Sequence, residues 1–261
     1  MSTTYEEGQT MTLIELPQGV TLKMVPILGG SFMIGSPEDE LNRFPNEGPQ
    51  HQVTLSEFLM GKYPITQAEW RAVASLSKVD RELDLDPSYF KGDNRPVERV
   101  NWFDAMEFCL RLSVHTGNLY TLPSEAQWEY ACRARTTTPF HFGETITPEL
   151  ANYKDSYTYA GEYRKQTSEV DNFSPNDWGL YDMHGNVWEW CLDHWHPGYE
   201  GAPDDGGAWV IGGNSDIRIV RGGSWTDNPR YCRCACRSFD YPGYRDFNRG
   251  FRVVSVPPKA L

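Results

Sequence analysis

Three cysteines stand at alternate positions in the C-terminal stretch SWTDNPRYCRCACRSFDYPGYRDFNRGFRVV, residues 224–254: Cys232, Cys234 and Cys236. Thiolates bind soft metals, act as nucleophiles and undergo redox chemistry. In an extended strand, residues two apart share a face, so the three thiols would point the same way. No histidine lies nearby in the sequence, and the C-x₂-C spacing of zinc sites is absent. A metal or redox site, a catalytic thiol pair and a binding surface all stay open at this point.

The other cysteines have a simpler interpretation. Cys109 lies in DAMEFCLRL and Cys132 in QWEYACRA, which are both helix-like patterns. Free cysteine is among the most often buried residue types, so both are predicted to be buried, reduced thiols. Six cysteines in 261 residues do not resemble the disulfide framework of a small secreted protein.

Charge and composition exclude several classes of protein. The net charge is −12 and the pI is near 4.9, which argues against nucleic acid as the main partner because phosphate binding needs a basic face. No apolar run approaches the roughly 18 residues of a membrane span. The first residues, MSTTYEEGQT, lack the basic and apolar regions of a secretory signal, which favours a cytoplasmic location.

The elements that must position the cysteines are short. Residues 1–20 are expected to form an N-terminal tail and residues 21–261 a single domain. KMVPILGGSFMIGS and HQVTLSEFLMGKYPIT alternate apolar and polar residues and predict strands. The predicted class is α+β, with short antiparallel strands, two or three helices and much irregular structure.

Helix-capping signals predict where the helices begin. Two pairs have the spacing of a capping box, Thr66 with Glu69 and Ser124 with Gln127, and Asn101 at the start of NWFDAMEFC is a candidate N-cap. Gly117 is expected to end the second helix. Its buried face is expected to hold five residues: Trp102, Met106, Cys109, Leu110 and Val114.

Seven motifs follow one another along the chain: GGSFMIGS, VTLSEFLMGKYPITQAEW, PVERVNWFDAMEFC, TLPSEAQWEYACRA, GLYDMHGNVWEWCLDHW, VRGGSW and GFRVV. Together they resemble the formylglycine-generating enzyme (sulfatase-modifying factor) family over roughly residues 20–255, and ordered motifs are far more specific than a single match. The resemblance implies a C-type-lectin-like fold that frequently binds calcium. Fold by itself does not settle function.

The segment LYDMHGNVWEW matches a calcium site of that family. The resemblance implies four ligands: Asp182, Gly185, Val187 and Glu189. Calcium takes carboxylate and carbonyl oxygens together, which suits this set. Asn152 and Tyr153 match the start of another calcium site, whose remaining ligands near Glu162 do not align. The alternative is that Trp188 and Trp190 are core residues and that Glu189 caps a turn.

Enzymes of the family oxidise a substrate cysteine to formylglycine with copper and oxygen, and hold copper between two cysteines spaced C-x-x-x-x-C. Counted from the shared C-x-x-R-S ending, Cys234 matches the second cysteine and Pro229 the first. Proline has no thiol, so the pair is broken and copper is not expected. Cys232 with Cys234 or Cys236 in an irregular loop stays an alternative. An ergothioneine-type sulfoxide synthase would need an iron-binding partner domain, for which the chain has no room.

The composition of residues 226–249 points to another function. These 24 positions hold no Lys, Glu, Gln, Met or Trp, although these types make up 49 of the 261 residues. The residue types present can all be encoded by codons ending in C, the set obtained when AAC asparagine codons are randomised at their adenines. The stretch therefore resembles the variable region of proteins that diversity-generating retroelements diversify on this same lectin-like fold.

That resemblance divides the stretch into fixed and varied positions. Thr226, Asp227 and Tyr231 would be randomised asparagines, and Cys234 and Cys236 accidents of randomisation. Aromatic and small polar residues suit a binding surface, and Tyr231, Phe239, Tyr241, Tyr244 and Phe247 would be its anchors. The expected ligand-binding set is Trp225, Thr226, Asp227, Asn228, Tyr231, Cys234, Cys236, Ser238, Phe239, Asp240, Tyr241, Tyr244, Asp246, Phe247 and Asn248.

The sequence therefore predicts a ligand-binding protein with a diversified surface over residues 225–248. Its partner is expected to be a macromolecule specific to this variant, a protein rather than nucleic acid or a membrane. The alternative is the copper-dependent oxidase acting on a substrate cysteine, and a non-diversified interaction module is the third.

Overall fold

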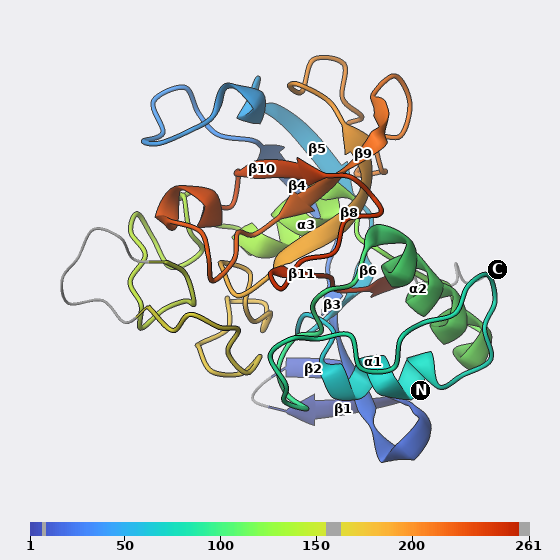
Figure 1. Ribbon diagram of the computed structural model, residues 1–261. Coiled ribbons are helices and arrows are strands. Elements are labelled where there is room, and N and C mark those ends of the chain that lie inside the picture. The colour runs from blue at the N-terminus through green and yellow to red at the C-terminus, as the bar shows by residue number, and fades with distance from the viewer. Residues whose placement is uncertain (7–8, 155–162, 256–261) are drawn as a thin grey trace.

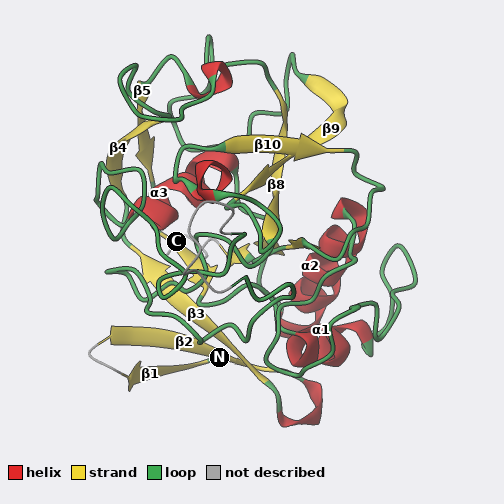
Figure 2. Ribbon diagram, turned by 60° about the vertical axis from the view of Figure 1, so that its left-hand side comes forward, coloured by secondary structure: helices red, strands yellow, loops and turns green. Residues whose placement is uncertain are grey.

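The computed structural model describes residues 1–6, 9–154 and 163–255. Short strands and helices alternate with long irregular loops, which Figures 1 and 2 show most clearly in the middle of the chain. The predicted α+β class is confirmed. Among the described residues, no helix is both long enough and apolar enough to cross a membrane.

The strands of the described chain form three sheets. The largest has the order β1 (Ser2–Glu6), β2 (Gln9–Glu15), β3 (Thr21–Ile27), β6 (Phe58–Gly61), β12 (Val254–Ser255), β7 (Tyr120–Thr121). The second has the order β10 (Arg237–Asp240), β9 (Asn214–Arg221), β8 (Trp188–Trp195), β11 (Arg249–Gly250), and only its β11–β8 pair is parallel. The third pairs β4 (Gly30–Ile34) with β5 (His51–Leu55).

The expectation of an N-terminal tail is wrong. β1 and β2 pair with each other, and β2 pairs with β3 from Thr12↔Met24 to Glu15↔Thr21. Met11 and Ile14 are each 1% exposed, although they lie three positions apart and point to opposite faces of β2. The first strands therefore extend the main sheet.

All three predicted helix starts are confirmed. α1 (Gln67–Ala74), α2 (Trp102–Thr116) and α3 (Glu125–Arg133) begin after Thr66, Asn101 and Ser124, and each has a complete capping box. Such boxes satisfy backbone N–H groups that the first helical turn leaves without partners. Gly117 ends α2 in the left-handed conformation (φ 73°), as predicted. Three short 3₁₀ turns, η1 (Pro17–Gly19), η2 (Pro45–Glu47) and η3 (Pro229–Cys232), complete the described elements.

The predicted buried face of α2 is only partly right. Cys109 is fully buried, but Leu110 is 39% exposed and Val114 is 74% exposed. The core instead receives Phe108 and Leu112, one and two positions away from the expected stripe. The buried side of α2 also includes Glu107 and Arg111, which form an ion pair at 2.6 Å. Because these buried residues are charged, a pattern of apolar residues could not identify the buried face of the helix.

Buried ion pairs join α3 to the second sheet. The guanidinium of Arg221 on β9 donates to Glu129 Oε2 (2.5 Å) and to Glu125 Oε1 (3.2 Å). Arg237 at the start of β10 donates to both oxygens of Glu125 (2.8 and 2.9 Å). Burial by itself would raise the pKa of Glu125, but Arg237 and Arg221 hold that pKa below its usual range. The Glu125 carboxylate stays ionised inside the protein because its cations are buried with it.

Replacing Arg221 with alanine is expected to lower the free energy of unfolding by about 3–5 kcal/mol, because it leaves two buried carboxylates with one cation each, Arg237 beside Glu125 and Arg133 beside Glu129. The matched control is Arg71→Ala, which removes an arginine from a solvent-exposed pair with Asp93 and should cost at most about 1 kcal/mol. Urea unfolding monitored by tryptophan fluorescence measures both. Equal losses for the two variants would contradict a special role for the buried pairs.

Candidate functional site

The C-terminal stretch begins with a glycine turn after β9. Gly222 and Gly223 have φ values of 96° and 72°, which side chains other than glycine rarely adopt. A Cβ on Gly223 would lie 2.7 Å from the sulfur of Cys232. This turn leads into η3, and the chain then returns as β10 along β9 with Arg237 opposite Arg221.

The three alternate cysteines do not share a face. Residues 232–236 form no strand, because η3 ends at Cys232 and the N–H of Cys236 bonds to the carbonyl of Arg233 (3.1 Å). Each sulfur enters a different hydrophobic cluster: Cys232 beside Phe140, Cys234 in the cluster under α3, and Cys236 in the core with α1 and α2. All three are 0% exposed. The prediction that Cys234 and Cys236 contact a ligand is therefore wrong.

Arginines from inside and outside the stretch hold its backbone. Arg221 donates to the carbonyls of Cys234 (2.7 Å) and Ala235 (3.2 Å). Arg233 pairs with Glu47 (2.5 Å) and Glu40 (2.5 Å). Buried charge-assisted hydrogen bonds of this kind fix geometry strongly. The backbone at Cys234 and Ala235 is therefore fixed from the interior of the protein.

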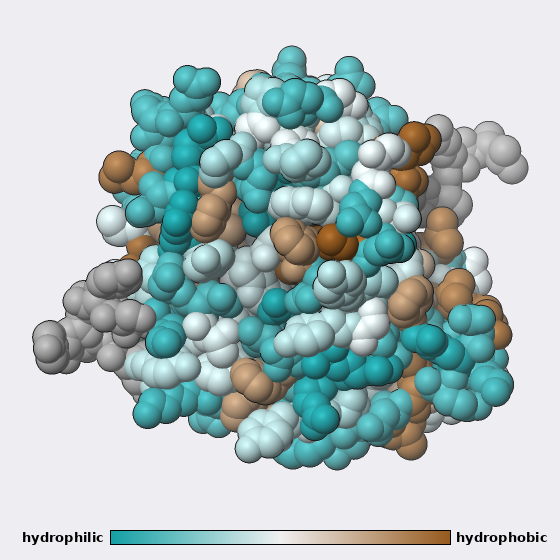
Figure 3. Space-filling model, turned by 45° about the horizontal axis from the view of Figure 1, so that its top comes forward, coloured by the Kyte–Doolittle hydropathy of each residue, from teal (hydrophilic) through white to brown (hydrophobic). Residues whose placement is uncertain are grey.

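Four aromatic side chains of the stretch are exposed: Phe239 (44%), Tyr241 (66%), Tyr244 (42%) and Phe247 (40%). We call these four residues the aromatic surface. They lie on β10 and on the loop that follows it. Exposure of this many aromatic groups in nine consecutive positions is typical of a binding surface. Figure 3 shows that the face of the molecule turned toward the viewer carries small, separate hydrophobic patches among hydrophilic atoms.

Helix α2 adds to the aromatic surface, which the sequence did not predict. The N–H of Trp102 bonds to the carbonyl of Pro242 (3.0 Å), and Arg245 forms two hydrogen bonds with Asp104 (2.9 and 3.0 Å). The start of α2 therefore lies against the loop after β10, and Phe103 there is 40% exposed. The available signal was a large apolar residue outside the buried stripe of a predicted helix.

The remaining residues predicted to bind ligand occupy two kinds of position. Trp225 (7% exposed) and Asn248 (8%) are buried, so their side chains support the loop rather than contact a partner. Tyr231 is half-buried between Phe44 (ring centroids 5.4 Å apart) and Trp188 (6.4 Å) and is not an exposed anchor. Six others are half-buried at the edge of the stretch: Thr226, Asp227, Asn228, Ser238, Asp240 and Asp246.

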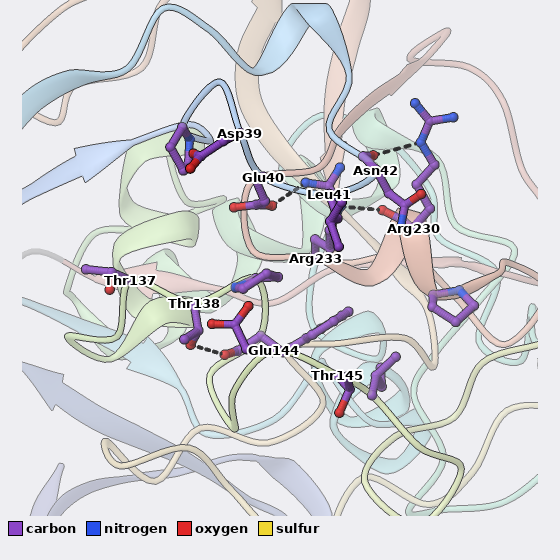
Figure 4. A pocket seen from close by; sticks show the side chains of 15 residues that line it. Asp39, Glu40, Leu41, Asn42, Thr137, Thr138, Glu144, Thr145, Arg230 and Arg233 are labelled. Carbon is purple, nitrogen blue, oxygen red and sulfur yellow. Dashed lines mark hydrogen bonds and ion pairs between the residues drawn. The ribbon is translucent and has the colours of Figure 1, made fainter.

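A cavity of about 590 Å³ adjoins η3. Figure 4 shows Asp39, Glu40, Leu41 and Asn42 above it, with Glu144 and the loop near Thr138 on the opposite side. Its arginines are engaged: Arg230 donates to the carbonyl of Asn42 (2.8 Å), and Arg233 donates to Glu40. The cavity mixes apolar and charged walls, with no buried, unpartnered group among its lining residues.

Beneath the stretch, two thiols and an imidazole meet. Cys132 on α3 lies 3.5 Å from Cys234, measured between the sulfurs, and 3.9 Å from Nε2 of His184. All three side chains are buried, and their three ligand atoms lie within 4.8 Å of one another. Burial by itself would raise the pKa of Cys234, but the hydrogen bond from Cys132 and the contact with His184 hold that pKa well below its usual range. The prediction that no histidine lies near these cysteines holds only along the sequence.

The predicted calcium ligands include two oxygens without partners. Asp182 Oδ2 and Asn152 Oδ1 are buried and accept no hydrogen bond from the described residues. Their segments adjoin, because Asn152 forms a β-bridge with Gly185 and its carbonyl accepts the N–H of Asn186 (2.8 Å). Burial raises the pKa of Asp182 well above its usual range. Unpartnered buried acceptors are costly, and a hard cation would satisfy them.

Glu189, by contrast, already has partners. Its carboxylate accepts from Arg252 (2.6 and 2.7 Å) and from Trp128 Nε1 (2.8 Å). Arg252 thus supplies the positive charge that a cation would otherwise bring. Val187 and Tyr153 are buried, and Glu162 lies outside the described residues. Asp182 and Asn152 each carry an unpartnered oxygen that suits a hard cation, whereas Glu189 does not require one.

Residues 11–256 match the family model of the sulfatase-modifying factor enzyme 1-like domain. The chain belongs to this family. The formylglycine-generating enzyme of Mus musculus is 29% identical to it over 289 residues, which cover 89% of this chain and 75% of the mouse protein. The C-type-lectin-like fold expected from the motifs is that of the family.

Two solved structures are similar over nearly the whole chain. PvdO from Pseudomonas aeruginosa has a TM-score of 0.81 and is 34% identical, with 94% of this chain and 98% of PvdO covered. Treponema denticola variable protein 1 has a TM-score of 0.76 and is 26% identical, with 95% of this chain and 99% of that protein covered. This chain therefore shares its fold with PvdO and with a variable protein.

Proposed function

We propose that this member of the sulfatase-modifying factor family is a ligand-binding protein whose aromatic surface is diversified by a retroelement. The observation that carries the proposal is that the four rings of the aromatic surface are exposed on a segment held by two ion pairs, Arg245 with Asp104 and Arg249 with Asp240. Exchanging such side chains changes the partner without refolding the core. The likeness to Treponema denticola variable protein 1 supports the same assignment.

The partner is a macromolecule, and a protein suits the surface best. Tyrosine and phenylalanine provide large contact areas at low cost in conformational entropy, and protein interfaces concentrate binding energy in such residues. Arg245 and Asp246 lie between Tyr244 and Phe247 in the sequence, and the hydroxyl of Tyr244 donates to Asp246 Oδ2 (2.9 Å). These groups would select among partners that the rings alone would accept.

The oxidase alternative rests on the mouse relative and meets two obstacles here. Pro229 occupies the place of one expected copper-binding cysteine. Cys234, in the place of the other, approaches Cys132 with both sulfurs fully buried. A substrate cysteine must reach the copper-binding sulfurs, so a buried pair disfavours this reaction.

The gene sequence tests diversification directly. If the proposal is right, the codons of the exposed positions from Ser238 to Phe247 end in C, and a near-copy with AAC codons lies beside a reverse-transcriptase gene. Codons for the buried residues Cys234 and Cys236 should not match AAC in that copy, because variation there would disturb the core. A genome with no near-copy of this segment would refute diversification, although binding itself would remain to be measured.

Removing two rings should weaken binding without loosening the fold. For Tyr241→Ala with Tyr244→Ala, we expect about 30-fold weaker affinity, corresponding to about 2 kcal/mol, for a partner identified by photo-crosslinking to the wild-type protein. Stability should change by less than about 0.5 kcal/mol. Tyr5→Ala is the control, because Tyr5 is 72% exposed on β1, outside the stretch. Unchanged affinity would exclude these rings from the interface, and a large loss of stability would place them in the core.

We further propose that calcium binds Asp182 and Asn152. Calcium at 100 times its dissociation constant should stabilise the wild-type protein by about 2.7 kcal/mol. Asp182→Ala should abolish this response and, without calcium, should not be less stable than the wild type, because it removes a buried oxygen without a partner. Asp177→Ala, at an exposed position of the same loop, should keep the response. Thermal unfolding in EGTA and in calcium measures all three proteins, and an unresponsive wild type would refute the site.

A further inference from the structure

We propose that Cys132, His184 and Cys234 form a zinc site beneath the C-terminal stretch. The three residues come from α3, from the loop before β8 and from the segment after η3. This set differs from the two-cysteine copper arrangement of the family enzymes, because one ligand is an imidazole and one sulfur comes from α3. The inference does not depend on the proposed function of the aromatic surface.

The distances between the ligand atoms are close to those of a zinc site. Zinc binds sulfur at about 2.3 Å and imidazole nitrogen at about 2.0 Å in a tetrahedron, which separates two sulfurs by about 3.8 Å and a sulfur from a nitrogen by about 3.5 Å. The observed separations are 3.5 Å between the sulfurs and 3.9 Å from Cys132 Sγ to His184 Nε2. Shifts of a few tenths of an ångström would complete the geometry.

The imidazole is already oriented as a ligand. Nδ1 of His184 lies 2.7 Å from the carbonyl of Cys232, so it carries the proton and donates. The lone pair is then on Nε2, toward the sulfurs, and an Nδ1–H bond to a carbonyl is the usual outer partner of a zinc-binding histidine. Nε2 also accepts the backbone N–H of His141 (3.1 Å), and zinc would replace this hydrogen bond.

Charge balance gives a reason for a divalent cation at this place. Two thiolates inside the protein would be costly on their own, whereas Zn²⁺ neutralises both. Carboxylates are absent from the described donor cluster, which favours a soft or borderline ion over calcium or magnesium. Three protein ligands leave the fourth zinc position to water.

Metal titration of the reduced full-length chain tests the site. After chelation and buffer exchange without oxygen, Co²⁺ should bind as a single equivalent with thiolate charge-transfer absorption, and Zn²⁺ should displace it. Cys132→Ser and His184→Asn should each weaken zinc binding by at least about 100-fold. Cys109→Ser is the matched control, since Cys109 is equally buried but lies in α2, and it should bind zinc normally.

A measurement on the wild-type protein tests the site even if the variants fail to fold. X-ray absorption of the zinc-loaded wild type should show sulfur at about 2.3 Å and nitrogen at about 2.0 Å. Binding only as several weak equivalents without sulfur in the first shell would overturn the proposal. So would a chain that takes up no zinc while Cys132 and Cys234 are shown to be free thiols.

Discussion

The two buried carboxylates of α3 are the constraint on which the C-terminal half of the structure depends. Glu125 and Glu129 lie inside the protein, where an ionised carboxylate is stable only beside a buried cation. Arg221 contacts both and also donates to the carbonyls of Cys234 and Ala235. One guanidinium therefore ties α3 and β9 to the backbone of the stretch that carries the aromatic surface.

These contacts of Arg221 separate the side chains that the fold requires from the side chains that can vary at the surface. The cysteines of the stretch, together with Arg233 and Arg237, point inward and pack or pair, whereas the four rings of the aromatic surface point outward. A backbone held from behind keeps its shape when outward side chains change, and one fold can then support many functions. The similarity to both a formylglycine-generating enzyme and a variable protein is consistent with this division.

The loop before β8 connects two places beneath that surface. Asp182 and Asn186 have positive φ values of 54° and 61°, a conformation that costs energy for residues other than glycine. Asp182 carries a buried oxygen without a partner, and His184, two residues further on, faces Cys132 and Cys234. A strained loop with such groups is the part of the structure where cations would contribute most to stability, at the calcium and zinc sites proposed above.

The sequence by itself determined the features that depend on neighbouring residues and on ordered motifs. The capping boxes at Thr66, Asn101 and Ser124 follow from local hydrogen bonds, and the family follows from the motifs. Only the tertiary structure decided the directions of the cysteines, because an irregular turn in place of a strand sends them into three clusters. The approach of Cys132 to Cys234, 102 residues away, likewise depends on how α3 packs, and no local pattern encodes such a contact.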